Sequence, residues 1–114
     1  MSAQKVTETE NYLMDAMSPF ELDTVLHQPL RTRIAAFLAT RDEATFTELK
    51  TSLEVTDGNL ESHIKKMVAI GYVRTKKLSV KKGRATTIYS LTKKGHEAFE
   101  NYLEALKRIL SVRL

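Results

Sequence analysis

Three polar side chains, Asn59, Ser62 and Lys66, recur at a spacing that places them on one face of a helix. Asparagine can form paired hydrogen bonds with the edge of adenine, and lysine can donate to guanine. Gly58 lies beside them and would let a backbone approach closely. The chemistry that this face suits is hydrogen bonding to base edges in a DNA groove.

The element that must position these side chains is an amphipathic helix predicted over about residues 57–70. Thr56 or Asp57 can begin it as an N-cap, and Gly71 can end it in a left-handed conformation. Apolar residues recur at i, i+4, i+7 and i+8 and define its buried stripe: Leu60, Ile64, Met67 and Val68.

The candidates for base readout are the polar residues at the start and on the outer face of this helix. They are Thr56, Asp57, Asn59, Ser62, His63 and Lys66. His63 has two interpretations, because it falls at the edge of the apolar face. It either contacts DNA or is a partly buried histidine bonded to a neighbouring side chain.

Charge is distributed unevenly along the chain. Ten Lys and Arg residues and no acid fall between Ser62 and His96, while the other residues carry eight cations against fourteen acids, a net charge of −6. Such sorting indicates one surface that meets a polyanion. The candidates for contacts with the DNA backbone are Arg31, Thr47, Lys65, Lys76, Lys77, Lys81, Lys82 and Arg84.

A β-hairpin is predicted directly after the helix. Residues 72–78 and 86–91 are rich in strand-forming residues, and Gly83 can turn the cationic loop between them. An ordinary hairpin exposed to solvent would mix its charges, whereas this one does not. We therefore interpret it as a wing.

Three helices and one short strand are predicted upstream. Ser18, Pro19 and Glu21 form a capping-box pattern for a helix that would continue through Val25 and end near Gln28. A second helix is predicted over residues 29–40. A short strand at 45–46 would precede a helix over 48–53, with Thr47 as its N-cap, and this helix and the next form a helix-turn-helix.

The last predicted helix begins after Thr92 and carries a broad apolar stripe. This stripe is wider than docking on one small domain requires, so we interpret the helix as a dimerisation element, with the alternative that it folds back on its own core. The interface candidates are Tyr12, Phe99, Tyr102, Leu103, Leu106, Ile109 and Leu110.

Composition excludes several classes of protein. The chain of 114 residues has the length of one domain, and without cysteine it has no disulfide, thiolate nucleophile or cysteine-based metal site. No secretory signal or membrane-length apolar run is present, so we expect a cytoplasmic protein. His27, His63 and His96 lie on separate predicted elements and no Gly-rich phosphate loop occurs, so the pattern favours no enzyme, metal or cofactor.

The order of elements resembles the winged-helix transcriptional regulators of the MarR and ArsR type, and especially their small single-domain members. The residues that carry the resemblance are LHQPLR (26–31), FTELK (46–50), TDGNLESHIKKM (56–67), GYV (71–73) and YSLTKKG (89–95). The resemblance implies a homodimer on a near-palindromic operator in double-stranded DNA. The lack of cysteine and of a His/Asp cluster departs from ArsR metal sensors.

The predicted fold is mainly α with a small β-hairpin: a winged helix-turn-helix with extra terminal helices. It divides into an N-terminal arm or short helix (1–17), the winged helix-turn-helix (18–91, wing about 72–91) and a C-terminal dimerisation helix (92–114). An RNA or protein partner is the alternative to DNA. The sequence identifies no small-molecule effector; the natural place for one is between residues 12–20, the first core helix and the last helix.

Overall fold

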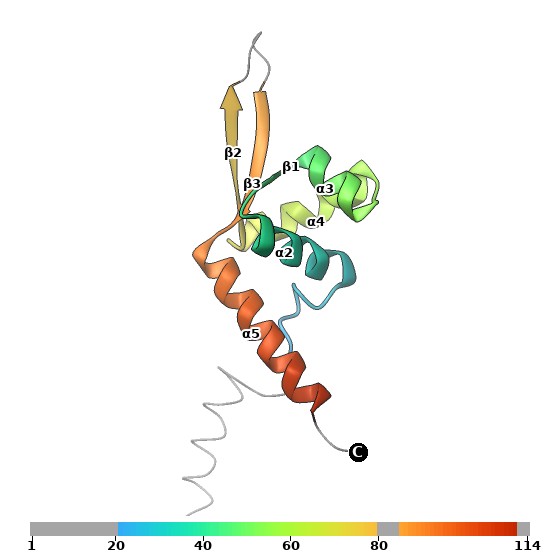
Figure 1. The fold of residues 1–114 in the computed structure, drawn as a ribbon, viewed down its shortest axis with the longest axis vertical. Coiled ribbons are helices and arrows are strands. Elements are labelled where there is room, and N and C mark those ends of the chain that lie inside the picture. The colour runs from blue at the N-terminus through green and yellow to red at the C-terminus, as the bar shows by residue number, and fades with distance from the viewer. Residues whose placement is uncertain (1–20, 80–84, 112–114) are drawn as a thin grey trace, which may run out of the picture.

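A computed structural model of the chain describes residues 21–79 and 85–111. It has the mainly helical fold with a small sheet that the sequence predicted (Figure 1). The elements are α2 (Pro29–Arg41), β1 (Ala44–Thr45), α3 (Phe46–Leu53), α4 (Asp57–Ala69), β2 (Val73–Ser79), β3 (Ala85–Leu91) and α5 (Lys93–Leu110).

The three strands form one antiparallel sheet in the order β1-β3-β2. Val73 pairs with Leu91 at the base of the β2–β3 hairpin, and Ser79 pairs with Ala85 at its far end. The short β1 pairs only with the basal part of β3. The hairpin therefore extends away from the helices, and α5 runs in the opposite direction (Figure 1).

The core lies where α2, α3, α4 and the base of the hairpin meet. Its fully buried large side chains are Leu26, Ile34, Leu38, Leu49, Leu60, Met67 and Val73. Burying an aliphatic side chain of this size stabilises a fold by roughly 1.5–3 kcal/mol. These contacts therefore hold α4 by its apolar face and leave its polar face uncovered.

No helix among residues 21–79 and 85–111 has the length and hydropathy to cross a bilayer.

The prediction of a helix that continues through Val25 and Leu26 is wrong, because residues 21–28 contain no helix. Residues 21–28 form a turn, in which Asp23 Oδ1 accepts hydrogen bonds from the amides of Val25 (2.8 Å) and Leu26 (2.9 Å). The His27 amide also donates to the Asp23 carbonyl (2.8 Å), so a single helix-like turn forms, and the Asp23 side chain accepts from the Val25 and Leu26 amides in place of a continuing helix. The proposed N-cap, Ser18, lies outside the described residues.

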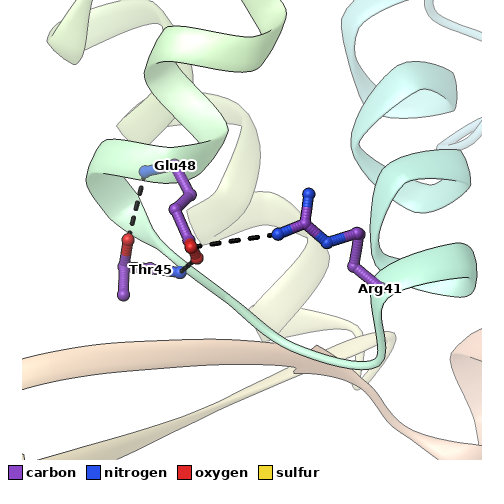
Figure 2. Close-up of polar contacts among 3 residues, drawn as sticks. All are labelled: Arg41, Thr45 and Glu48. Atoms are coloured by element: carbon purple, nitrogen blue, oxygen red, sulfur yellow. Dashed lines mark hydrogen bonds and ion pairs between the residues drawn. The ribbon is translucent and has the colours of Figure 1, made fainter.

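The prediction that Thr47 caps the helix-turn-helix is also wrong, because the cap is Thr45. The Thr45 hydroxyl accepts from the Glu48 amide (3.1 Å), and the Glu48 carboxylate accepts from the Thr45 amide (2.9 Å; Figure 2). This is a capping box, and the spacing T-x-x-E was its signal in the sequence. Thr47 is exposed in the first turn of α3.

The junction between α4, the hairpin and α5 is tight. Gly71 adopts φ +84°, and the amides of Gly71 and Tyr72 bond to the carbonyls of Val68 (3.0 Å) and Met67 (2.9 Å), as in a Schellman cap. Lys94 donates to the Ile70 carbonyl (2.9 Å). Lys94 lies in the first turn of α5, where a cation opposes the helix dipole, but it also lies at the carboxyl end of α4, where a cation is favourable.

Candidate nucleic-acid interface

Helix α4 presents the polar face that the sequence predicted. Leu60, Ile64 and Met67 are buried, and Asn59, Ser62 and Lys66 are exposed on the side away from the core. The apolar contacts therefore fix the rotation of the helix, and through it the direction of the polar side chains. The arrangement can offer amide, hydroxyl and ammonium groups to a groove without unfolding.

The start of α4 is fixed by side chains that the sequence had proposed for base readout. The Thr56 hydroxyl accepts a hydrogen bond from the Asn59 amide (3.2 Å), so Thr56 is the N-cap. The Asp57 carboxylate forms an ion pair with Lys50 of α3 (2.8 Å), and both side chains are exposed. This ion pair neutralises the charge of Asp57, the acid in the first turn of α4, and links α3 to α4.

His63 is half-buried at the edge of the polar face. Its Nδ1 lies 2.8 Å from a terminal nitrogen of the Arg31 guanidinium. Burial lowers the pKa of His63, and the positive charges of Arg31 and Lys66 lower it further. The structure thus supports the interpretation of His63 as a partly buried histidine bonded to a neighbour, while its place on α4 also keeps it beside the polar face.

Arg31 was predicted to contact phosphate, and in the structure it has two partners within the protein. Its Nε donates to the Val25 carbonyl, and its terminal nitrogen contacts His63. The side chain therefore connects the turn before α2 with α4. A phosphate contact remains a prediction and would use the other guanidinium donors.

The cationic residues of β2 lie on both faces of the hairpin. Lys76 and Lys77 are exposed and, as neighbours in a strand, point to opposite faces. Lys77 shares the face of Thr75, which is turned toward α4. Lys81, Lys82 and Arg84 follow β2 in the sequence but lie outside the described residues.

A groove of about 330 Å³ separates α4 from the base of the hairpin, and no pattern in the sequence indicates it. Lys65, which was predicted to contact the DNA backbone, lines the α4 side of this groove. Val68 also lines the groove and is 38% exposed, so its assignment to the buried stripe of α4 was wrong. The remaining lining residues are Glu61, Ile64, Ala69, Thr75 and Tyr89. Burial and the nearby Glu61 carboxylate raise the pKa of Tyr89.

The apolar residues of α5 divide into two groups. Phe99 and Tyr102 are 8% and 5% exposed and pack in the core of the chain itself, so in a dimer they could support the interface only from behind. Leu103 and Leu110 are 44% and 77% exposed. Leu106 and Ile109 are partly buried. Tyr12 lies outside the described residues.

Two tyrosines hold the turn before α2 and were missed as positioning residues. The Tyr72 hydroxyl donates to Asp23 Oδ2, and burial together with this hydrogen bond raises the pKa of Tyr72 to about 12. The Tyr102 hydroxyl lies 3.0 Å from His27 Nδ1. No sequence spacing could reveal these pairs, because their members are 49 and 75 residues apart.

Known proteins are similar to this chain in sequence and in fold. An uncharacterized protein of Methanocaldococcus jannaschii is 46% identical over 79 residues, which cover 69% of this chain and 85% of that protein. A transcriptional regulator homologue from Pyrococcus horikoshii has a solved structure with 31% identity and a TM-score of 0.70, covering 90% of this chain and 94% of its own.

The fold is also similar to that of Bacillus subtilis PadR, solved in complex with operator DNA. The TM-score is 0.56 at 14% identity, over 61% of this chain and 44% of PadR. The family described as winged helix DNA-binding domain matches residues 30–110, from the start of α2 to the end of α5. The chain therefore belongs to the winged-helix DNA-binding domain family, and its fold is that of winged-helix transcriptional regulators.

Proposed function

We propose that this protein is a sequence-specific regulator of transcription that binds a near-palindromic operator in double-stranded DNA as a homodimer. The observation that carries the proposal is the uncovered polar face of α4, with Asn59, Ser62 and Lys66 exposed, on a chain of a DNA-binding family. In this proposal α4 enters the major groove, and the hairpin contacts the neighbouring backbone or minor groove.

The proposed contacts with DNA are of two kinds, to bases and to phosphates. Base contacts come from Asn59, Ser62 and Lys66, with Thr56, Asp57 and His63 at the start and edge of the same helix. Phosphate contacts come from the cationic hairpin and from the first turn of α3, where Thr47 is exposed. Phosphate contacts give affinity that depends on salt, whereas base contacts give discrimination between sequences.

The proposal is tested by selecting genomic DNA fragments with the purified protein. A gel shift then compares the selected duplex with a random duplex, a single strand and double-stranded RNA. We expect the selected duplex to bind at least about a thousandfold more tightly than the random duplex. Equal binding to all four would contradict sequence-specific recognition of DNA, and preference for RNA would support the alternative of an RNA-binding winged helix.

We expect Asn59→Ala to lower discrimination between the selected and the random duplex by about tenfold or more, because a paired contact with adenine contributes roughly 1–3 kcal/mol. Asn59 is exposed, so the free energy of unfolding should barely change. Binding titrations with both duplexes check this. If both affinities fell by the same factor, Asn59 would position the helix and would not read a base.

The homodimer is proposed to form through α5. Leu103 and Leu110 are exposed on its apolar side, and the partly buried Leu106 lies between them. We expect Leu103→Glu to produce a monomer in sedimentation experiments, because a carboxylate within an apolar interface loses its hydration without gaining a partner. Operator affinity should then fall, since one recognition helix would bind without the other.

Asn101→Glu is the matched control for this variant. It adds the same charge to the same helix two residues earlier, at an exposed polar position. We expect it to remain a dimer. A wild-type chain that sediments as a monomer at the concentrations used for DNA binding would contradict the proposed dimer, whatever the variants do.

Membership of a DNA-binding family favours a binding protein over an enzyme. A protein partner is less suited to the lysines of β2, because the centres of protein–protein interfaces are depleted in lysine. We propose α2 and α5 as the place where a small-molecule effector would alter the spacing of the two recognition helices; residues 12–20, predicted to complete this site, lie outside the described residues. A metabolite screen for changes in operator affinity tests this.

A further inference from the structure

The contact between Arg31 and His63 constrains the chemistry that α4 can present. A neutral imidazole has one nitrogen that donates a hydrogen bond and one that accepts, and either nitrogen can take either role. A guanidinium has donors only. Because Arg31 lies 2.8 Å from Nδ1, this nitrogen must be the acceptor, and the proton of the neutral ring must be on Nε2.

We propose that Arg31 is a positioning residue that fixes the tautomer and orientation of His63, so that α4 presents Nε2–H as a dedicated hydrogen-bond donor. The inference deepens the proposed function and rests on it for the identity of the acceptor. Its chemical premise, the tautomer, concerns the free protein alone.

Three observations support this role. Arg31 is itself held, because its Nε donates to the Val25 carbonyl in the turn before α2. Nε2 has no partner among the described residues, and none of their buried side-chain nitrogens or oxygens lacks one, so Nε2 is accessible to solvent. The charged groups that face His63 are the cations Arg31 and Lys66, which oppose a second proton on the ring.

A fixed donor selects its partner on DNA. It can bond to N7 or O6 of guanine, N7 of adenine, O4 of thymine or a phosphate oxygen, and it is mismatched with the amino group of cytosine. Asn59 carries both a donor and an acceptor and can adapt by rotating its amide. His63 held by Arg31 cannot adapt in this way, so it would add discrimination that the sequence of α4 alone does not predict.

The first test uses the free, full-length protein labelled with ¹⁵N. Two-bond ¹H–¹⁵N correlation spectra at pH 7.5 should show His63 with its proton on Nε2 and with Nδ1 unprotonated. In Arg31→Met we expect the ¹⁵N chemical shift of Nδ1 to change, because its hydrogen-bond donor is gone, and the His63 pKa to rise, because one of the cations is gone. Burial and Lys66 would remain, so the rise should be partial.

Arg33→Met is the matched control. Arg33 lies on the same helix and donates to the Leu53 carbonyl (2.8 Å), so its loss removes an arginine and a hydrogen bond without touching His63. The tautomer and pKa of His63 should stay as in the wild type. A wild-type spectrum with the proton on Nδ1 would overturn the proposal without any variant, as would an unchanged His63 in Arg31→Met.

The second test is a double-mutant cycle of Arg31→Met and His63→Ala with the selected and random duplexes. Each single variant should lower operator affinity by about threefold to tenfold, and the double variant should lose no more than His63→Ala alone, apart from the effect that Arg33→Met also shows. Losses confined to the operator assign a base acceptor, and equal losses on both duplexes assign a phosphate. A loss of discrimination in the double variant that exceeds that of His63→Ala alone would sink the idea that Arg31 acts through His63, because a phosphate contact of Arg31 itself would weaken both duplexes alike.

The two tests separate the two proposals. If the tautomer is as expected and the wild type has no preference for any duplex, the proposed function fails and the chemistry of His63 stands. If the wild type discriminates between duplexes and the tautomer is the other one, the proposed function stands and this inference fails.

Discussion

Gly95→Ala is expected to lower the free energy of unfolding by about 3 kcal/mol, more than a methyl group added at either of the other two glycines that the structure describes. A Cβ at Gly95 would lie 2.1 Å from the Tyr72 carbonyl oxygen and 2.9 Å from its carbon. Both are backbone atoms, so no rotation of a flexible side chain can relieve the clash.

The carbonyl cannot easily move away, because it is bonded. The Thr92 amide donates to it (3.0 Å), and the Thr92 side chain also caps α5 by accepting from the Gly95 amide (2.9 Å). Moving Tyr72 would disturb the end of α4 and the first residues of β2, while moving α5 would pull Phe99 from the core. Either adjustment breaks contacts that connect α4, the β2–β3 hairpin and α5.

Gly58→Ala is the control, since it adds the same methyl group to the other helical glycine. No atom lies within 4 Å of its Cβ position. We expect the free energy of unfolding to stay the same or to rise by up to about 1 kcal/mol, because alanine favours helix. Urea titrations of both variants check the pair. A loss below about 1 kcal/mol in Gly95→Ala would mean that α5 can shift without cost.

Removing two cations from the loop between β2 and β3 is expected to have the largest effect on DNA binding. In Lys82→Ala with Arg84→Ala, affinity for the selected and the random duplex should fall alike, by about tenfold to a hundredfold. A hydrogen bond to a charged group contributes roughly 1.5 kcal/mol or more. The slope of log affinity against log salt should flatten by about 1.8, the value for two phosphate contacts.

A matched pair of cations provides the control for total charge. Lys107 and Arg108 lie near the end of α5, which points away from the hairpin (Figure 1). Lys107→Ala with Arg108→Ala changes the net charge of the chain equally. We expect its salt slope to match that of the wild type. Equal slopes for the wild type and the loop variant would remove the wing from the proposed mechanism.

Local rules predicted most of the elements, because their signals lie within a few residues of each other. Pro29 begins α2, Thr56 caps α4, Gly71 ends it with φ +84°, and Thr92 caps α5. Each of these residues acts on backbone groups that are no more than one helical turn away. The same reasoning could have found Thr45, whose partner Glu48 follows at the spacing of a capping box.

The turn at residues 21–28 shows where local signals fail. Its residues can form a helix, yet Asp23 accepts from two amides of the turn and from the hydroxyl of Tyr72, which is 49 residues away. The two local bonds favour the turn over a helix, and the distant Tyr72 hydroxyl holds the same carboxylate in place. The Arg31–His63 contact spans 32 residues and was equally hidden from the sequence.

The sequence by itself determined the winged helix-turn-helix, the cationic hairpin and the polar face of α4 with Asn59, Ser62 and Lys66. Periodicity and the order of charges are properties of neighbouring residues, so both can be recognised from the sequence alone. Only the tertiary structure decided that Phe99 and Tyr102 belong to the core of the chain, that Val68 lines a groove, and that Arg31 holds His63. These outcomes depend on which faces meet across the fold, and that is set by packing between elements far apart in the sequence.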